Sequence, residues 1–313
     1  MNTNLEQSIL RTLAYFDLFS HPLTREEVYK WLWGYTNIDC TDFVNDLNRY
    51  VEAGVIDYRQ GFYFLPGKVD ITEERQRRIR LMEDRLKVAV RGLKKLRYLP
   101  FVRAVFVCNT LAMGTVTSES DVDVLVVAKE GRIWLARFFS NLVLKLFRLR
   151  TGKRGSANKI CLSFFLTEDN LNLESTRIVE PDIYMIYWLV QLLPIYDPHN
   201  IRKKILDDNS WTNNFVSDRR QEFSLLDKYK VQDSKFSGAI KKILENMWNG
   251  GYGKLLEDQA RGSQIVKMKI RGIRQGENKN IIINDSIIKL HENDRREEYQ
   301  GEWIELCEER LKD

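Results

Sequence analysis

The sequence predicts an α+β protein with two or three domains along its 313 residues. Three observations support this fold class. Apolar residues recur at helical spacing through most of the first hundred residues. Beyond Pro100, short β-type apolar runs alternate with one long helical segment, which is typical of a sheet with flanking helices. From Glu174 onward the spacing is mostly helical, so residues 173–313 are expected to form a mostly helical C-terminal region.

The first domain, residues 1–68, has the pattern of three helices followed by a hairpin. The first helix is expected over residues 5–19. Thr24 and Glu27 have capping-box spacing and mark the start of the second helix, and Thr41 is placed to cap the third. The two strands of the hairpin are expected at residues 55–59 and 62–65. This order of elements resembles a winged-helix domain.

The expected third helix carries mostly negative charge. Winged helices that read DNA insert this helix into the major groove, where phosphate repulsion would oppose an acidic surface. We therefore expect a packing or protein-contact module, and we expect no specific binding of duplex DNA. The charged residues concerned are Asp39, Asp42, Asp46 and Glu52, against Arg49.

Residues 69–100 are expected to form a long basic helix that links the first domain to the next. Its apolar residues step by three and four from Ile79 to Leu96. The rest of its surface is basic, through Arg75, Arg77, Arg78, Arg80, Arg85, Lys87, Arg91, Lys94, Lys95 and Arg97. Two alternatives stay open: a solvated helix face, or a surface that contacts nucleic acid or a triphosphate.

Residues 101–172 are expected to form a sheet core. Its strands are predicted at residues 103–107, 122–127 and 159–166, with a helix at residues 133–149 between the last two. Near the C-terminus, a further strand is expected at residues 280–284. The densely polar segment that follows, residues 289–296, is expected to be a surface turn.

The segment between the first two core strands carries the candidate chemistry. The stretch from Cys108 to Gly114 is followed by a polar loop and by Asp121 and Asp123 at the start of the second strand. Side chains alternate between the two faces of a strand, so both carboxylates point the same way. Paired carboxylates offer the oxygen ligands that Mg²⁺ prefers. The alternative is that both are polar residues that merely begin a strand.

This segment resembles the signature of the DNA polymerase beta-like nucleotidyltransferase superfamily, in particular its minimal bacterial members. The matching residues are Leu111, Ala112, Gly114, Ser120, Asp121 and Asp123. The resemblance implies a nucleotidyltransferase-fold mixed sheet with flanking helices. It implies that Asp121 and Asp123 are catalytic and bind Mg²⁺ or Mn²⁺. It also implies nucleotide binding, by Asn109, Thr110, Gly114 and Ser120.

The chain departs from the family pattern in three places. Asn109 and Thr110 stand where the family has Gly-Ser, and Met113 occupies a position that is often Arg. The family also places a third carboxylate on a later strand. The corresponding position here is expected to be Ser163, and the next acids along the chain are Glu168 and Asp169. Without a third acid, the attacking hydroxyl lacks an obvious base.

Two classes of function follow from these residues. The first is a Mg²⁺-dependent enzyme that moves a nucleoside monophosphate from a nucleoside triphosphate to a hydroxyl of a protein, a small molecule or an RNA. The second is a nucleotidyltransferase-fold protein with impaired catalysis that acts as a partner-binding, antitoxin-like or regulatory module. The paired aspartates favour the enzyme, because clustered carboxylates repel one another unless a cation offsets them.

Composition and local pattern indicate the partners and the cellular compartment to expect. The formal net charge of +5 is too small by itself to indicate nucleic-acid binding. The 4 cysteines form no CxxC pair, so reduced thiols in the cytoplasm are expected. The N-terminus lacks the pattern of a signal peptide. The apolar segments at residues 133–149 and 183–193 are either interrupted by charge or too short to span a membrane, so no membrane association is expected.

Overall fold

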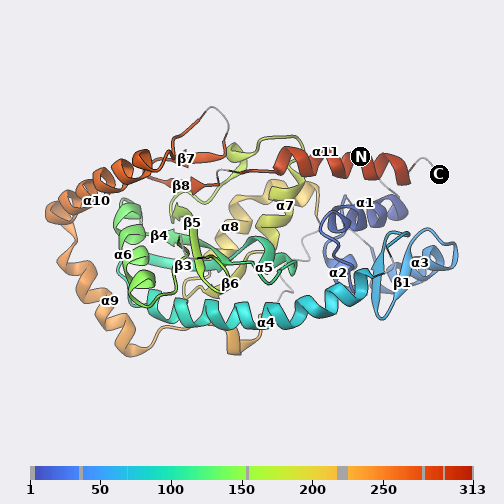
Figure 1. Cartoon of the computed structure of the whole chain (residues 1–313), viewed down its shortest axis with the longest axis horizontal. Helices are drawn as coiled ribbons and strands as arrows, with labels where there is room; N and C mark the ends of the chain where they lie inside the picture. Colours follow the sequence, from blue (N-terminus) through green and yellow to red (C-terminus); the bar gives the residue numbers. More distant parts are fainter. Residues whose placement is uncertain are drawn as a thin grey trace.

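The computed structural model describes residues 4–34, 38–68, 70–152, 155–216, 225–276, 279–291 and 293–311. Helices surround a six-stranded mixed sheet, and a separate two-stranded sheet lies in the N-terminal part (Figure 1). The α+β fold class expected from the sequence is therefore confirmed.

The N-terminal part forms in the order predicted, as three helices and a hairpin. The helices are α1 (Leu5–Asp17), α2 (Arg25–Lys30) and α3 (Cys40–Glu52), and the hairpin strands are β1 (Asp57–Arg59) and β2 (Phe62–Phe64). The capping box at α2 is present, because the Glu27 amide donates to Thr24 Oγ1 at 3.2 Å and the Thr24 amide donates to Glu27 Oε2 at 2.9 Å. The cap of α3 differs from the prediction: Asp39 is the N-cap, and its carboxylate accepts from the Thr41 amide at 2.7 Å.

The apolar core of this N-terminal part extends into the C-terminal region. Residues of α1 to α3 share one buried cluster with residues of α7 (Ile183–Val190) and α11 (Arg296–Arg310). In Figure 1, α4 (Ile71–Leu96) along the bottom and α11 along the top both run between the large sheet and the N-terminal helices. The N-terminal helices are thus packed onto the rest of the chain along two helices.

The large sheet has the strand order β6-β3-β4-β5-β8-β7. Strands β4 and β5 are parallel and are joined by α6 (Ile133–Leu146), whereas the other neighbouring pairs are antiparallel. The three predicted core strands and the late strand are present. Two further strands were missed: one lies in a region expected to be mostly helical, and the other ends in the first two residues of the expected surface turn. The bounds are β3 (Val102–Val107), β4 (Val122–Ala128), β5 (Ile160–Thr167), β6 (Leu193–Tyr196), β7 (Ile281–Ile283) and β8 (Ile287–Leu290).

The two faces of this sheet pack against different helices. One face buries its side chains against α4, α6 and α10 (Gly250–Ile270). The other face packs against α7 and α8 (Ile201–Asp208). Because side chains alternate along a strand, each strand contributes to both cores. The remaining helices are α5 (Asn109–Met113), α9 (Lys235–Met247) and the 3₁₀ turns η1 (Glu174–Thr176), η2 (Ser210–Asn214) and η4 (Asp227–Tyr229).

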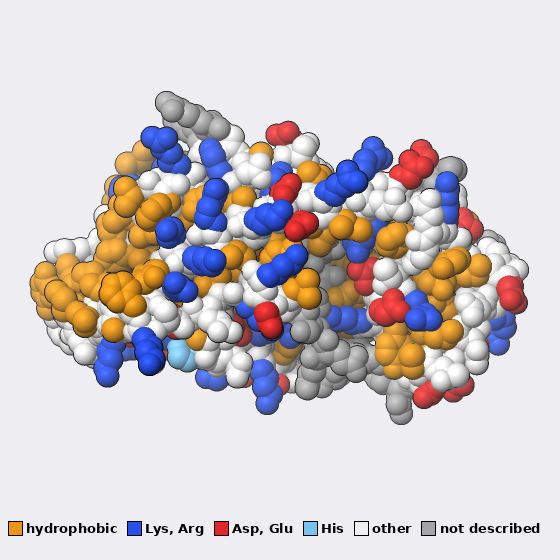
Figure 2. Space-filling model, turned by 90° about the horizontal axis from the view of Figure 1, so that it is seen from below, with side chains coloured by type: hydrophobic (Ala, Val, Ile, Leu, Met, Phe, Trp, Pro, Cys, Tyr) orange, Lys and Arg blue, Asp and Glu red, His pale blue; other side chains and the backbone are white. Residues whose placement is uncertain are grey.

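The surface has one region that is rich in apolar side chains. Large apolar residues of α6, α9 and α10 are exposed there, and Figure 2 shows this apolar region at the end of the molecule that those helices form. On the same view, Lys and Arg side chains gather along α4. These exposed basic residues include Arg77, Arg80, Lys87, Arg91 and Lys94.

None of the described helices combines the length and the apolar character that crossing a bilayer requires.

Candidate metal centre

Asp121 and Asp123 lie where strands β4 and β5 begin side by side. Val122 and Val124 point into the core under α4 and α6, so strand alternation turns Asp123 to the opposite face. On β5, the residue paired with Asp123 is Cys161. The ligand atoms of Asp121, Asp123 and Cys161 all lie within 4.8 Å of one another. The structure therefore brings the two predicted aspartates together and adds a thiol to them.

Cys161 is a residue that the sequence reasoning did not identify. The alignment placed Ser163 opposite the aspartates, but the pairing of β4 with β5 shifts between Asp123 and Leu125, which moves Ser163 one step out of the regular alternation. Ser163 is only 7% exposed, and its hydroxyl lies beside the Cys161 thiol. Among the described residues, its Oγ has no nitrogen or oxygen partner, and its contact with Cys161 favours the ionised thiol. The sequence offered one signal for Cys161: it lies two residues before Ser163, and residues two apart on a regular strand point to the same face.

Glu168 lies at the opposite end of the sheet from the two aspartates. Its amide donates to the carbonyl oxygen of Ala128, the last residue of β4, at 2.9 Å. Its carboxylate forms an ion pair with Arg103, with Oε1 at 3.5 Å from Nε. Asp123 stands near the start of the same strand, so Glu168 cannot add a ligand or a base to this cluster.

Burial and mutual repulsion control the charge of this cluster. Burial first, and then the charge of Asp123, raise the pKa of Asp121 to about 6. Burial, followed by the charges of Asp123 and Asp121, raises the pKa of Cys161 to about 12. Arg150 lies beside the Cys161 thiol and close enough to Asp121 to favour both ionised forms. In the metal-free protein the thiol is therefore protonated at neutral pH.

Arg85, a buried residue of α4, holds the loop that leads into Asp121. Its Nε donates to the Ser120 carbonyl at 2.8 Å, and its Nη2 donates to the Ser118 carbonyl at 2.7 Å. A third bond joins its Nη1 to the Asn158 side chain, just before β5. The Ser120 hydroxyl, a predicted nucleotide ligand, accepts from the Thr117 amide at 2.9 Å and braces the same loop. One guanidinium thus ties together the segments that carry Asp121 and Cys161.

The other predicted nucleotide ligands lie on the short helix α5 and at its end. Asn109 has a left-handed backbone, and its Oδ1 accepts from Trp188 Nε1 at 2.8 Å. Thr110 is exposed in the first turn of α5. Gly114 ends α5 with φ +84°, and a Cβ added there would lie 2.8 Å from Arg75 Nη1 and 2.9 Å from His21 Cε1. Gly114 is therefore required by packing against α4 and the N-terminal part.

A cavity of about 180 Å³ lies on the side of the sheet that carries Asp123, although the three residues of the cluster do not line it. Asn109 lines it together with the stacked rings of Phe164 and Trp188, whose centroids are 5.4 Å apart. His291 is also in its wall; burial lowers the pKa of this imidazole, and the negative charge of Asp123 acts in the opposite direction. The turn that follows β3 therefore forms part of the cavity wall, on the face of the sheet to which Asp123 points.

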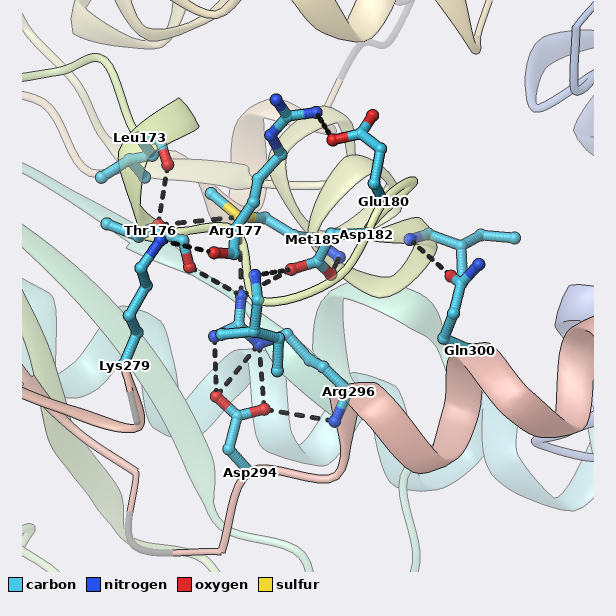
Figure 3. Close-up of polar contacts among 12 residues, drawn as sticks. Leu173, Thr176, Arg177, Glu180, Asp182, Met185, Lys279, Asp294, Arg296 and Gln300 are labelled. Carbon is cyan, nitrogen blue, oxygen red and sulfur yellow. Dashed lines mark hydrogen bonds and ion pairs between the residues drawn. The ribbon is translucent and has the colours of Figure 1, made fainter. Parts of the chain in front are cut away.

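Most described residues of the expected surface turn line this cavity, and three of them are buried, so the expectation of a surface turn is wrong for Lys289, Asp294 and Arg296. Arg296 forms ion pairs with Asp182 at 2.8 Å and with Asp294 at 2.9 Å, and Lys289 pairs with Asp294 at 2.8 Å. Each of these four side chains is at most 8% exposed. Figure 3 shows Arg296 between the two carboxylates, beside Thr176 and Met185. The attraction between opposite charges offsets the cost of burying them only where they meet. The sequence pattern could not reveal that these four side chains meet.

The donor atoms of the cluster fit a divalent cation, but not equally well for every metal. The carboxylates of Asp121 and Asp123 suit Mg²⁺ and Mn²⁺. The sulfur of Cys161 suits Zn²⁺ or Co²⁺ and is a poor ligand for Mg²⁺. In the described part of the chain, the third group of this cluster is therefore a thiol and not a carboxylate.

A comparison with protein-family models gives no match, and comparisons with curated proteins and with solved structures give no significant match.

Proposed function

We propose that this chain binds a nucleoside triphosphate together with a divalent metal ion and transfers the nucleoside monophosphate to a hydroxyl acceptor. The observation that supports this proposal is the proximity of Asp121 and Asp123 at the start of β4, beside the start of the parallel strand β5 and next to the turn that follows β3. A bound metal would neutralise charge on the phosphates and on the leaving pyrophosphate.

The proposed reaction forms a bond between the acceptor oxygen and the α-phosphorus and breaks the bond from that phosphorus to the β-phosphate oxygen. Pyrophosphate leaves with the electron pair, and the acceptor proton passes to solvent. Asp121 and Asp123 hold the metal, while exposed Thr110 offers a hydroxyl to the phosphates. The aromatic cavity beside Asn109 accommodates the part of the substrate beyond the triphosphate.

A second candidate function is nucleotide binding without transfer, by a partner-binding or regulatory module. The observation that favours it is the thiol of Cys161, which stands beside the two aspartates as the third group of the cluster, where a carboxylate would serve a transferase. With a pKa raised to about 12, this thiol is not a base at neutral pH. The loss of general-base assistance slows transfer by roughly 10²–10⁴-fold, so an enzyme of this design is slow.

The test measures binding and transfer separately. Calorimetry with each of the four ribonucleoside triphosphates, with Mg²⁺ or Mn²⁺, reports binding. Release of pyrophosphate and transfer of an α-phosphate label to the protein itself or to RNA reports chemistry. The variant Asp123→Asn should abolish both. The matched control is Glu119→Gln, which removes an exposed carboxylate from the same loop and should change neither.

The outcomes separate the two candidates. Metal-dependent transfer that Asp123→Asn abolishes supports the enzyme. Metal-dependent binding without transfer supports the binding module, and Cys161→Asp should then raise transfer by restoring a third carboxylate. If no triphosphate binds with either metal, the assignment of a nucleoside triphosphate to this site is wrong.

A further inference from the structure

We propose that Asp121, Asp123 and Cys161 form a mixed carboxylate–thiolate site that selects a thiophilic divalent ion, such as Zn²⁺ or Co²⁺, over Mg²⁺. This inference rests on the metal site of the proposed function and names its metal. It starts from the sulfur, because hard Mg²⁺ takes oxygen ligands at near-ideal octahedral geometry. A thiolate close to two carboxylates instead matches the ligand types of zinc sites.

The geometry is that of a site with an open position. The three ligand atoms lie within 4.8 Å of one another, on the paired starts of β4 and β5. Zn²⁺ binds sulfur at about 2.3 Å and carboxylate oxygen at about 2.0–2.2 Å. A single ion can therefore reach all three groups after small side-chain rotations. Three protein ligands leave a fourth position free, as catalytic zinc sites do.

A second observation, independent of the acids, points to an ion at the sulfur. The Ser163 hydroxyl is 7% exposed and has no nitrogen or oxygen partner among the described residues, and its contact with the Cys161 thiol favours the ionised form of that thiol. Buried hydroxyls without a partner are costly. A metal-bound thiolate would accept a hydrogen bond from this hydroxyl, which is the kind of supporting contact that orients metal ligands.

Charge balance also fits a divalent ion with a bound thiolate. The two carboxylates and the thiolate together carry three negative charges, and Arg150, beside Cys161 and Asp121, carries one positive charge. A divalent ion brings the sum to zero. Binding the ion breaks the S–H bond of Cys161 and forms a metal–sulfur bond, and the proton is released to solvent. Metal binding therefore depends on pH and releases one proton per thiolate formed.

The test uses the full chain after treatment with a chelator, titrated with Co²⁺ in the absence of nucleotide. A thiolate bound to Co²⁺ gives a near-ultraviolet sulfur-to-cobalt charge-transfer band. We expect this band to saturate at one equivalent, to disappear on addition of Zn²⁺ and to persist in a large excess of Mg²⁺. Cys161→Ser should abolish the band. Ser163→Ala should keep it and weaken Co²⁺ binding by about 10–100-fold.

Matched variants identify the sulfur. Cys40→Ser removes an exposed thiol and should leave the band unchanged. Cys108→Ala removes a buried thiol near Asp123 and should also leave it unchanged. A band that is lost in Cys108→Ala but kept in Cys161→Ser would overturn the proposal. If Cys161→Ser does not fold, Cys161→Asp takes its place, since it supplies an oxygen ligand at the same position. Cys161→Asp should lack the band and bind Mg²⁺ more tightly than the parent.

The result is distinguishable from a failure of the proposed function. The absence of any band, with Mg²⁺-dependent triphosphate binding intact, would overturn the metal selectivity alone. A saturable band without binding of any triphosphate would instead leave the metal site standing and remove the nucleotide.

Discussion

Asp121 and Asp123 are held close together although their charges repel. The pKa of Asp121, raised to about 6 by burial and by Asp123, shows that the ionised form is disfavoured in the fold. Ionisation therefore costs stability as the pH rises from the unfolded-state value to about 6, and the cost is fully present above that pH. A bound cation would offset this repulsion, so the paired carboxylates favour a metal at this site.

We predict that Asp121→Asn stabilises the metal-free protein while it removes metal binding. At pH 8 the free energy of unfolding should rise by on the order of 1 kcal/mol, after allowance for the partial exposure of this carboxylate. The gain should shrink towards pH 4, where Asp121 is already protonated in the folded protein. Urea unfolding with a chelator at both pH values measures it. A less stable variant at pH 8 would contradict the argument.

Gly114 is a residue whose role in the structure is packing. Its φ of +84° disfavours a side chain, and the added Cβ would meet Arg75 and His21. We predict that Gly114→Ala lowers the free energy of unfolding by about 1–3 kcal/mol more than Gly131→Ala does. Gly131 has φ +64° and open space around its Cα, so it is the control for the backbone cost alone. Equal losses of stability in the two variants would show that the close approach of Arg75 and His21 does not exclude a Cβ at position 114.

At the scale of elements, the buried ion network around Arg296 fastens β8 and α11 to α7. Asp294 is central to it, since it pairs with both Lys289 and Arg296 and its side chain is 6% exposed. Although burial acts to raise the pKa of Asp294, hydrogen bonds and charges from Arg296 and Lys289 lower it to about 2. The carboxylate therefore stabilises the fold above its unfolded pKa of about 4, and this stabilisation is lost as the pH falls through about 2.

We predict that Asp294→Asn costs about 3–5 kcal/mol of stability near neutral pH, because it leaves buried Lys289 without its ion partner and removes one of the two carboxylates that pair with buried Arg296. The difference from the parent should be constant between pH 5 and 8 and narrow towards pH 2. Denaturant unfolding across this range measures it. Asp227→Asn breaks an exposed ion pair with Lys230 and should have no measurable effect. A loss that is equally large at pH 2 would mean that the charge of Asp294 is not responsible.

At the scale of the whole molecule, the N-terminal helices and the C-terminal helix share a core. Trp303 of α11 donates from Nε1 to the Arg11 carbonyl at 2.9 Å, and its ring lies 5.0 Å from that of Trp33. Met113, at the end of α5 near the candidate metal centre, is buried in the same cluster. The N-terminal part is therefore coupled by packing to the segment that carries the site.

We predict that Trp303→Ala destabilises the protein by about 3–5 kcal/mol and that the N-terminal part then unfolds together with α11. Differential scanning calorimetry should show that Trp303→Ala lowers the temperature of the transition in which α1 to α3 melt. The control is Ile304→Ala, one position along the same helix, where the side chain is 43% exposed. An N-terminal transition at an unchanged temperature in Trp303→Ala would show that the shared core does not couple the two parts.

The sequence by itself determined the features that depend on neighbouring residues. Helical spacing predicted α4 and α6, the capping-box pattern predicted the start of α2, and alternation predicted that Asp121 and Asp123 share a direction. Each of these patterns is read within a few turns of helix or a few strand positions. The fold class followed from their order along the chain.

The tertiary structure alone decided which distant residues meet. Cys161 joins the aspartates, and Ser163 stands one step aside, because the pairing of β4 with β5 contains an irregularity that only cross-strand packing determines. Glu168 lies at the far end because β5 runs parallel to β4. The side chains of Lys289, Asp294 and Arg296 are buried because they pair with one another and with Asp182, which lies more than a hundred positions earlier. Local spacing specifies how a segment folds, whereas register and charge pairing arise from contacts between segments that the spacing does not encode.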